Sequence, residues 1–438
     1  MTAPRRSLFT VVQSCPPLPR LIRREHHSGD STTTPAWPRT DLNELVIWSS
    51  FDDEIRRTQT TLQAIFIAPN FALDIPTIRK VGDETHVQGV IENTILSVVE
   101  NVAREIVSEP DFSCSIAGVP GLLLDPDFIF ASQATPKAKL VGEVKTPWAF
   151  GASRNLVQDW HDSRGTRNKT VRAIEQVYGY LTFNNLRYGV LTTYETTWFF
   201  KRTCSPQGGR LEVTAPFRYE STPQLIFAYT TIVRLADEHW LHASPTSSPG
   251  PASPIVRRRT QPSNPDPHLL QTAAPPSDIH LTQGVDRSRV GGIVRGNYRG
   301  QPVIFKTVDV SKHRALTQEL DHEVTVYQAI AHLQGDAVVR VIAYVEVWEM
   351  LRLLVLEDHG VNLWMYEQQG GKASVLKTKC RECLQKVHAT GYLHGDIRLP
   401  NFLVSNGVVR LVDFGQAKQS TVREEFIAEM RELNPLFS

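Results

Sequence analysis

The chain has 438 residues, more than one ordinary hydrophobic core organises, so its length predicts two or three domains. The 47 basic and 46 acidic side chains leave a formal net charge of +1, which excludes the strong overall field of many nucleic-acid and membrane binders. No run of 18 apolar residues and no apolar export signal occurs, and the five cysteines are scattered. These features predict an intracellular protein of the cytoplasm or nucleus, with no membrane partner and no disulfide framework.

The first segment, residues 1–41, combines arginine, proline, serine and threonine with little apolar periodicity. Such a composition buries too little apolar area to offset the entropy of the chain. We therefore expect a disordered N-terminal segment, with regular patterning beginning at residue 42.

Residues 42–240 alternate helical and strand patterns, which predicts an α/β domain. The segment from Glu92 to Ile106 places its isoleucines and valines on one helical face. Two apolar strands then flank a polar connector at 131–139, a pattern typical of a hairpin. After the first helix we predict strands at 122–130 and 140–145, a helix at 171–181, and strands at 188–194 and 197–202.

Charged residues lie on both strands of this hairpin. Asp127 ends the segment LDPD, whereas Glu143 and Lys145 belong to the segment VGEVK. Alternation along a strand puts Glu143 and Lys145 on one face, and Asp127 on the neighbouring strand can bring a second carboxylate to the same Mg²⁺. The alternative is that these charges only decorate strand ends, as charged residues commonly do.

These motifs and the order of helix and strands resemble the PD-(D/E)xK nuclease superfamily, which has a restriction-endonuclease-like fold. The resemblance implies Mg²⁺-dependent cleavage of nucleic acid, with Lys145 stabilising charge or positioning the nucleophile. It implies a further ligand on the first helix, Glu92 or Glu100, and places Gln176 with Tyr180 on a helix near the site. Many members of the superfamily are binding modules, so a domain without catalysis stays open.

Residues 241–282 are rich in proline and serine, as in SPTSSPGPASP at 244–254 and AAPPS at 273–277. Proline-rich segments of this kind are extended and form no core. We expect a disordered linker between two folded domains, the second of which covers 283–438.

The second domain contains the most informative motif, HGDIRLPN at 394–401, followed by the apolar segment FLV and by LVDFG at 411–415. Transfer of a phosphoryl group needs a carboxylate that receives or orients the proton of the acceptor hydroxyl. It also needs oxygen ligands for Mg²⁺, such as an amide oxygen and a second carboxylate. Asp396, Asn401 and Asp413 supply these side-chain types in this order.

Four segments precede this motif. PVIFK predicts a strand that ends at Lys306, and a helix from about 316 to 333 carries Glu323. LRLLVL predicts a strand that leads to Glu357, and a helix over 374–388 comes before the HGD segment. Each piece occurs by chance elsewhere, so the prediction depends on their consecutive order within a short stretch of chain.

The ordered set resembles the protein-kinase domain in a minimal form, like RIO-like and fungal-type kinases. The resemblance implies a bilobal α+β fold that binds ATP and Mg²⁺. It implies Asp396 as the base, with Asn401 and Asp413 as metal ligands. It further implies that Lys306 grips the α and β phosphates of ATP and that Glu323 is the ion-pair partner of this lysine.

The nucleotide-binding parts depart from the kinase pattern. The loop GVDRSRVGG at 284–292 does not satisfy G-x-G-x-x-G, although Gly292 can serve as its last glycine. Glu357 would lie near the adenine edge. Gly395 replaces the usual arginine, as in RIO-like kinases and aminoglycoside-type phosphotransferases, so switching by activation-loop phosphorylation is not expected. The chain continues for 23 residues after Gly415, too few for a full peptide-docking lobe.

A nuclease-like module joined to a minimal kinase also resembles Crinkler-type and related fungal proteins. The leading hypothesis is an ATP- and Mg²⁺-dependent phosphotransferase that acts on a serine or threonine hydroxyl of a protein substrate. One alternative is a Mg²⁺-dependent DNA or RNA nuclease whose kinase-like part acts as regulator. The other is a pseudokinase scaffold without turnover, which the degraded glycine loop favours.

Overall fold

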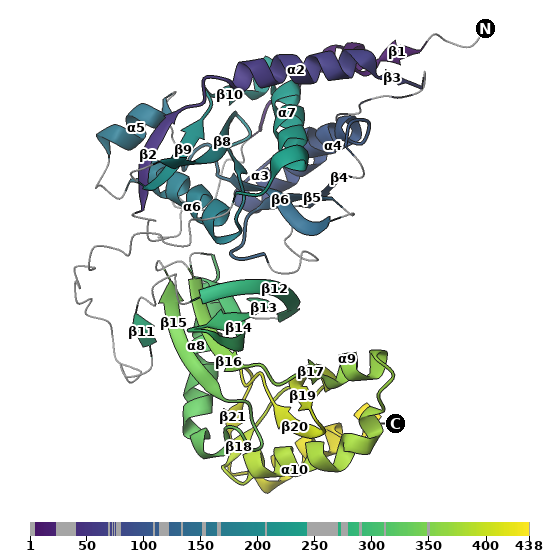
Figure 1. Ribbon diagram of the computed structural model, residues 1–438, viewed down its shortest axis with the longest axis vertical. Helices are drawn as coiled ribbons and strands as arrows, with labels where there is room; N and C mark the ends of the chain where they lie inside the picture. Colours follow the sequence, from purple (N-terminus) through teal and green to yellow (C-terminus); the bar gives the residue numbers. More distant parts are fainter. Residues whose placement is uncertain are drawn as a thin grey trace. The chain divides into compact units, whose positions relative to one another are not determined.

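The computed structural model is a mixed α/β protein with several sheets, and it divides into two compact units, Met1–Val256 and Arg257–Ser438 (Figure 1). Within the described residues, no helix is both long and apolar enough to cross a membrane. The described residues are 5–22, 41–68, 71, 73, 75, 80–107, 110–113, 122–132, 135–150, 155–163, 168–205, 208–242, 270–272, 279–288, 291–310, 312–347 and 351–437.

The first unit is built on an eight-stranded sheet with the order β2-β9-β8-β7-β6-β5-β4, and β10 pairs with β8. The pairs β2–β9 and β6–β7 are parallel, and the remaining pairs are antiparallel. The strands are β2 (Leu42–Ile47), β4 (Pro110–Ser113), β5 (Phe128–Ser132), β6 (Thr135–Val144), β7 (Tyr188–Thr192), β8 (Thr196–Ser205), β9 (Gly208–Val213) and β10 (Phe217–Arg218).

Helices cover both faces of this sheet (Figure 1). Phe128 and Phe130 belong to the core cluster shared with α2, α4 and α7, whereas Gly189 faces Val177 and Leu181 of α6 on the other side. Gly142 lies opposite Phe128, and a Cβ there would come within 1.9 Å of the phenylalanine ring, so only glycine fits. The helices are α2 (Phe51–Ala64), α3 (Glu84–Ile91), α4 (Ser97–Ala103), α5 (Leu156–Asp162), α6 (Lys169–Phe183) and α7 (Gln224–His239).

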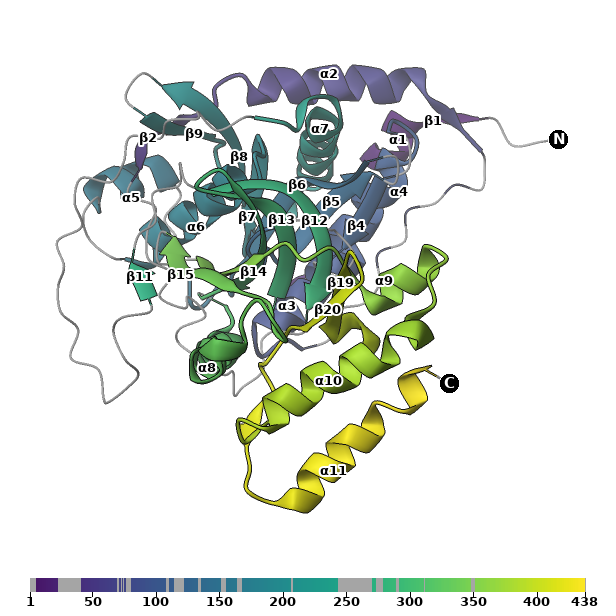
Figure 2. The same cartoon turned by 60° about the horizontal axis from the view of Figure 1, so that its bottom comes forward.

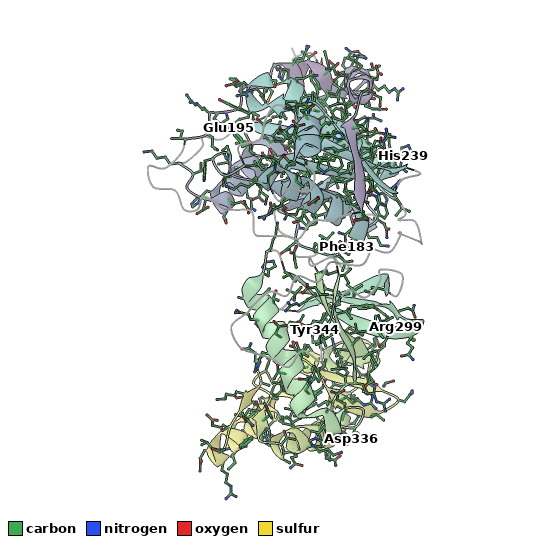
Figure 3. All side chains as sticks on the ribbon, turned by 90° about the vertical axis from the view of Figure 1, so that its left-hand side faces the viewer. Phe183, Glu195, His239, Arg299, Asp336 and Tyr344 are labelled. Atoms are coloured by element: carbon green, nitrogen blue, oxygen red, sulfur yellow. The ribbon has the colours of Figure 1, made fainter. Side chains whose placement is uncertain are left out.

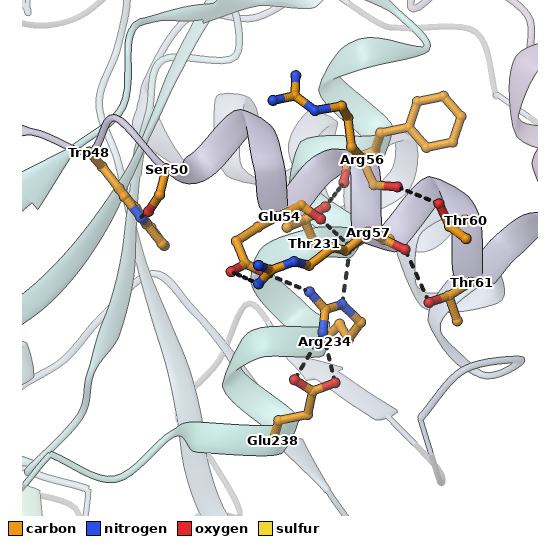
Figure 4. A network of polar contacts seen from close by, with 12 residues as sticks. Trp48, Ser50, Glu54, Arg56, Arg57, Thr60, Thr61, Thr231, Arg234 and Glu238 are labelled. Carbon is orange, nitrogen blue, oxygen red and sulfur yellow. Dashed lines mark hydrogen bonds and ion pairs between the residues drawn. The ribbon is translucent and has the colours of Figure 1, made fainter.

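An ion cluster around Arg234 joins α2 to α7 (Figure 4). The guanidinium donates to both carboxylate oxygens of Glu238 at 2.8 and 2.9 Å and to Glu54 at 3.0 Å. Its Nε donates to Thr58 at 3.1 Å. A planar guanidinium fixes both distance and angle to its carboxylates, so Arg234 sets how α2 and α7 cross.

The first predicted helix is wrong in its bounds. The helical segment begins at Glu84, where Asp83 caps it by accepting a hydrogen bond from the His86 N–H at 2.9 Å, and it ends at Ala103. Between α3 and α4, residues Glu92–Leu96 form a turn of π-helix. Gly89, a weak helix former, obscured the first two turns in the sequence.

The later predicted elements of this unit are present with shifted ends, and the strand predicted at 122–130 begins only at Phe128. The hairpin forms from β5 and β6, but its strands extend through much of the connector predicted at 131–139, of which residues 133 and 134 lie outside the described residues. The helix predicted at 171–181 is α6, and the strands predicted at 188–194 and 197–202 are β7 and β8.

The prediction that residues 1–41 are disordered is wrong for residues 5–22. β1 (Arg6–Ser7) pairs with β3 (Phe66–Ile67), and α1 (Leu8–Gln13) buries Leu8, Val11 and Val12. The spacing i, i+3, i+4 of these side chains gives α1 an apolar face in a segment whose overall composition hid it. Residues 1–4 and 23–40 lie outside the described residues.

The second unit begins with a six-stranded sheet of order β11-β15-β16-β14-β13-β12. β11 and β15 are parallel, and the other neighbours are antiparallel. Helix α8 (Arg314–Ala329) follows β14 and packs on β14 and β16. The strands are β11 (Leu270–Thr272), β12 (Ile279–Ser288), β13 (Gly291–Tyr298), β14 (Gln301–Asp309), β15 (Val341–Val347) and β16 (Leu351–Glu357).

The rest of the second unit is mainly helical around two small sheets, one of order β17-β19-β20 and one of β18 with β21. Figure 2 shows α10 and α11 side by side. The four segments predicted before and around the HGD motif are confirmed as β14, α8, β16 and α10. The elements are β17 (Val361–Asn362), α9 (Leu363–Gln368), α10 (Lys377–His388), β18 (Tyr392–Leu393), β19 (Phe402–Ser405), β20 (Val408–Leu411), β21 (Lys418–Gln419) and α11 (Arg423–Glu432).

The boundary predicted between linker and second domain differs from the structure. β11 and the first residues of β12 fall inside the segment 241–282, because main-chain hydrogen bonds to a sheet edge need few apolar side chains. Residues 243–269 and 273–278 lie outside the described residues, so the disordered linker stays a prediction there.

Candidate functional site

Asp396 and Asn401 are brought together by the turn between β18 and β19. The Asn401 side-chain amide donates hydrogen bonds to the main-chain oxygen of Asp396 at 2.9 Å and to its Oδ2 at 3.0 Å. Asn401 is buried and ends a short 3₁₀ helix. These two bonds hold the carboxylate of Asp396 in one orientation and leave the amide oxygen of Asn401 as the atom able to face a cation.

Lys306 forms the centre of a second group. Its Nζ lies 2.6 Å from Oε2 of Glu323 on α8 and 2.7 Å from Oδ1 of Asp413. The other oxygen of Glu323 accepts a hydrogen bond from the Phe414 N–H at 3.3 Å. The pairing predicted between Lys306 and Glu323 is therefore present, and both side chains are buried.

Burial and charge act against each other at these three groups. Burial alone would lower the pKa of Lys306, but the carboxylates of Glu323 and Asp413 raise it, so the ammonium is retained. Burial would raise the pKa of Asp413, yet the adjacent Lys306 holds it below its usual range. The site therefore contains a fixed cation and an ionised carboxylate, the charges that a Mg²⁺-bound polyphosphate requires.

Arg398 connects the two groups, and sequence reasoning missed it. Its Nε lies 2.9 Å from Oδ2 of Asp396, and its Nη2 lies 3.8 Å from Oδ2 of Asp413. An unbroken series of contacts thus runs from Glu323 through Lys306, Asp413, Arg398 and Asp396 to Asn401. The available signal was an arginine two residues after the candidate base, between two acidic motif positions.

The main chain of this site is held in unusual conformations. Asp413 has a φ of +70°, a region that side-chain-bearing residues rarely adopt and that occurs often at functional sites. Gly395 has a φ of +80°, and a Cβ there would lie 2.2 Å from the main-chain oxygen of Gln416. The glycine that replaces the usual arginine is thus required by the backbone at this position.

Glu429 on α11 binds the main chain of the loop that contains His394 and Gly395, and no motif predicted this residue. Its Oε1 accepts a hydrogen bond from the Gly395 N–H at 2.6 Å, and its Oε2 accepts from the His394 N–H at 3.0 Å and lies 2.6 Å from His388 Nε2. Burial would raise the pKa of Glu429, but these donors lower it, so the carboxylate stays ionised.

The donor set fits Mg²⁺ bound together with phosphate. Asp413 and Asn401 offer a carboxylate and an amide oxygen, which are hard ligands of the kind that Mg²⁺ prefers. In the described part of the chain, no group of three or more His, Cys, Asp or Glu side chains could hold a metal ion. A Mg²⁺ ion at Asp413 would therefore need oxygen ligands from a nucleotide, as is usual for this ion in phosphotransfer sites.

Glu357 and Gly292, the other residues predicted to contact the nucleotide, form hydrogen bonds with protein groups. The carboxylate of Glu357 accepts hydrogen bonds from the Arg410 guanidinium at 2.7 Å and from the Arg340 N–H at 2.8 Å, so it is directed at protein groups. Gly292 pairs with Thr307 in the β13–β14 ladder, and its oxygen accepts from the Thr307 hydroxyl at 3.2 Å. Residues 289 and 290 of the predicted glycine loop lie outside the described residues.

The first unit contains a second cluster of charged side chains at the hairpin. Asp127 accepts hydrogen bonds from the Val144 N–H at 2.6 Å and from Gln88 Nε2 at 2.7 Å. Lys145 forms a close ion pair with Glu143, and both side chains are buried. The hairpin register therefore brings Asp127, Glu143 and Lys145 to one end of the sheet, as their positions predict.

Two helices complete this cluster. Tyr180 on α6 donates to Glu143 at 2.9 Å, and Gln176 donates to the Tyr180 hydroxyl at 2.8 Å, so the helix predicted to lie near the site does so. From α3, Glu84 approaches Lys145 with 4.0 Å between Oε2 and Nζ. Glu84 and Gln88 share one helix face because they are four residues apart.

The contacts of this cluster do not include the predicted helix ligands. Glu92 is exposed within the π-helical turn, and Glu100 on α4 forms an ion pair with Arg104 just beyond the helix. Glu84 and Gln88 contribute side chains to the cluster, and they lie on α3, two turns before the predicted start of the helix.

No protein-family model matches this chain, and no curated protein matches it. The two clusters described above, with their distances and burial, are thus the basis for assigning a function.

Proposed function

We propose that the second unit is an ATP- and Mg²⁺-dependent phosphotransferase that acts on a serine or threonine hydroxyl of a protein. The observation that carries the proposal is the series of contacts from Glu323 through Lys306, Asp413, Arg398 and Asp396 to Asn401. Lys306 and Asp413 are 107 residues apart in the chain, and their side chains meet in this series of contacts.

Each side chain has a chemical role in the proposed reaction. Lys306, held protonated by two carboxylates, binds the α and β phosphates of ATP. A bound Mg²⁺ would neutralise charge on the transferring phosphoryl group. Asp396, oriented by Asn401, accepts the proton of the acceptor hydroxyl. Arg398 places a second positive charge between Asp396 and Asp413, where negative charge increases during transfer.

Partly exposed apolar side chains next to Lys306 support a nucleotide site. Ile304 lies two residues before Lys306 on the same strand face and packs against the core of the unit, as do Leu403 and Val412 near Asn401 and Asp413. Binding sites for flat, weakly polar groups such as adenine combine an apolar lining with a few fixed polar groups.

Substitution of Asp396 tests the proposal. We expect Asp396→Ala to reduce phosphoryl transfer from labelled ATP to a protein acceptor by about 10²–10⁴-fold, because the acceptor loses its base. Asp336→Ala is the matched control, since Asp336 is exposed in the same unit and pairs with Lys386. Unchanged transfer in purified Asp396→Ala would contradict the assignment. Thermal stabilisation by Mg²⁺-ATP without transfer to any hydroxyl would favour the pseudokinase alternative.

A Mg²⁺-dependent nuclease is the second candidate, and the hairpin cluster of the first unit favours it. Asp127, Glu143 and Lys145 converge there with Glu84 and Gln88. Incubation of DNA and RNA with Mg²⁺ would separate the candidates. Nicking that is lost in Glu143→Ala and kept in Asp396→Ala would assign the activity to the first unit.

A further inference from the structure

A charged cluster ties α8 to the sheet of the second unit. Nη1 of Arg352 on β16 lies 2.7 and 2.8 Å from the two carboxylate oxygens of Asp321 on α8. Nε of the same arginine lies 2.9 Å from Glu346 on β15. Tyr344, labelled in Figure 3, donates its hydroxyl to Asp321 at 2.5 Å. We call Asp321, Tyr344, Glu346 and Arg352 the α8 clamp.

The clamp lies on the same face of the sheet as Lys306. Arg352 is the cross-strand partner of Val308, and Lys306 is the partner of Leu354. Because Val308 and Lys306 are two residues apart on one strand, the side chains of Arg352 and Lys306 project from the same face. α8 covers this face and presents Asp321 to the clamp and Glu323, two residues later, to Lys306.

The clamp is rigid by its chemistry. The Arg352 guanidinium binds Asp321 through Nη1 and Glu346 through Nε, and the planar group fixes the distance and angle between these two nitrogens, which the single nitrogen of an ammonium ion cannot do. Tyr344 is buried, and burial raises its pKa, so its hydroxyl remains a donor to Asp321. The guanidinium of Arg352 also lies over the Tyr344 ring, 6.0 Å from its centroid. Sliding of α8 along the sheet would therefore break several bonds at once.

The opposite side of α8 is held by the segment that follows Asp413. His322 Nε2 lies 2.7 Å from the main-chain oxygen of Ala417, and Gln416 donates to Glu319 at 3.0 Å. Tyr327 packs edge-on against the ring of Phe414, with 5.0 Å between centroids. α8 is thus held from two sides, by the clamp and by the segment that follows Asp413.

We infer that the α8 clamp is a positioning device that keeps Glu323 within reach of Lys306. A phosphotransfer site of the proposed kind requires the lysine–glutamate pair and the metal-binding aspartate to be in place together. Helices on sheets commonly have more than one stable position, and the clamp selects one of them. The inference deepens the proposed function. Only the expected effect on turnover rests on that function, and the expected position of α8 does not.

The test measures the accessibility of Lys306 in the full chain. Arg352→Lys keeps the charge but loses the two-point contact, and Tyr344→Phe removes only the hydroxyl. We expect acylation of Lys306 by an amine-reactive succinimidyl ester, followed by mass spectrometry, to accelerate about threefold or more in both variants, because open positions of α8 become populated. Arg234→Lys is the matched control, a similarly buried arginine bound to two oxygens of Glu238 in the first unit.

Kinetics supply the second measurement. We expect the two clamp variants to lower kcat/KM for ATP about tenfold, whereas Arg234→Lys leaves it unchanged. Equal acylation rates at Lys306 in wild type, clamp variants and control would overturn the inference. Acylation that is faster in the clamp variants but not in the control would support the inference. This holds even if the wild-type protein transfers no phosphoryl group, and the absence of transfer would contradict the proposed function alone.

Discussion

Glu429 and Arg398 show which site residues the sequence hides. The order of Lys306, Glu323, Asp396, Asn401 and Asp413 along the chain predicted that these side chains lie close together, and the structure joins them in one series of contacts. Arg398 follows a motif position, and Glu429 lies on a later helix. Their roles depend on tertiary contacts, which spacing along one chain does not specify. The same holds for Gln88, which binds Asp127 across 39 residues.

Replacement of Glu429 by glutamine is expected to destabilise the second unit. Glutamine has one acceptor oxygen, so its NH₂ group would face the N–H of His394 or Gly395 and leave a buried donor without a partner. We expect a loss of about 1–3 kcal/mol in the free energy of unfolding, measured by chemical denaturation at pH 7. Exposed Glu432 on the same helix offers the control Glu432→Gln, which should change stability little.

The pH dependence of this difference has a defined sign. The folded-state pKa of Glu429 lies below the ordinary glutamate value of 4.5, so its stabilising effect is complete above that pH and is lost as pH falls through the folded-state pKa. The gap in stability between wild type and Glu429→Gln should therefore narrow as the pH decreases from about 5 to about 3. A gap that widened over this range would show that the carboxylate is not stabilised by its donors.

At the scale of elements, apolar periodicity predicted α6, β7, β8, β14, α8, β16 and α10. No prediction covered α2, α7, β2 or β9, and the errors elsewhere have physical causes. α1 is short and lies in a polar segment, so its three buried side chains were outweighed by composition. α3 contains Gly89, which weakened the helical pattern. β11 is a three-residue strand that depends on its partner β15. Such elements are stabilised by tertiary contacts more than by their own propensities.

Substitution of Leu8 tests whether α1 belongs to the core of the first unit. Leu8 is completely buried in the cluster shared with α2 and α7. We expect Leu8→Ala to lower the free energy of unfolding of this unit by about 2–4 kcal/mol, because it removes apolar contacts and leaves a cavity. The same change at Leu241, which is 52% exposed, is the control. A Leu8→Ala protein as stable as Leu241→Ala would show that the N-terminal segment does not contribute to folding.

At the scale of the whole molecule, the division into Met1–Val256 and Arg257–Ser438 predicts two unfolding transitions in calorimetry. Mg²⁺-ATP at about 100 times its dissociation constant should stabilise one of them by about 2.7 kcal/mol, because ligand binds the folded form of one unit. Leu8→Ala should lower the other transition. Movement of both transitions with ATP would contradict a nucleotide site confined to the second unit.

The parallel pairing of β11 with β15 has a consequence for how the second unit can be handled in isolation. β15 would otherwise be the outermost strand of its sheet, with a row of main-chain donors and acceptors open to another chain. A fragment beginning after Thr272 would carry every side chain of the proposed phosphotransfer site and still expose this row. Such a fragment is expected to self-associate through edge-to-edge strand addition, whereas one beginning before Leu270 keeps its own chain on that edge.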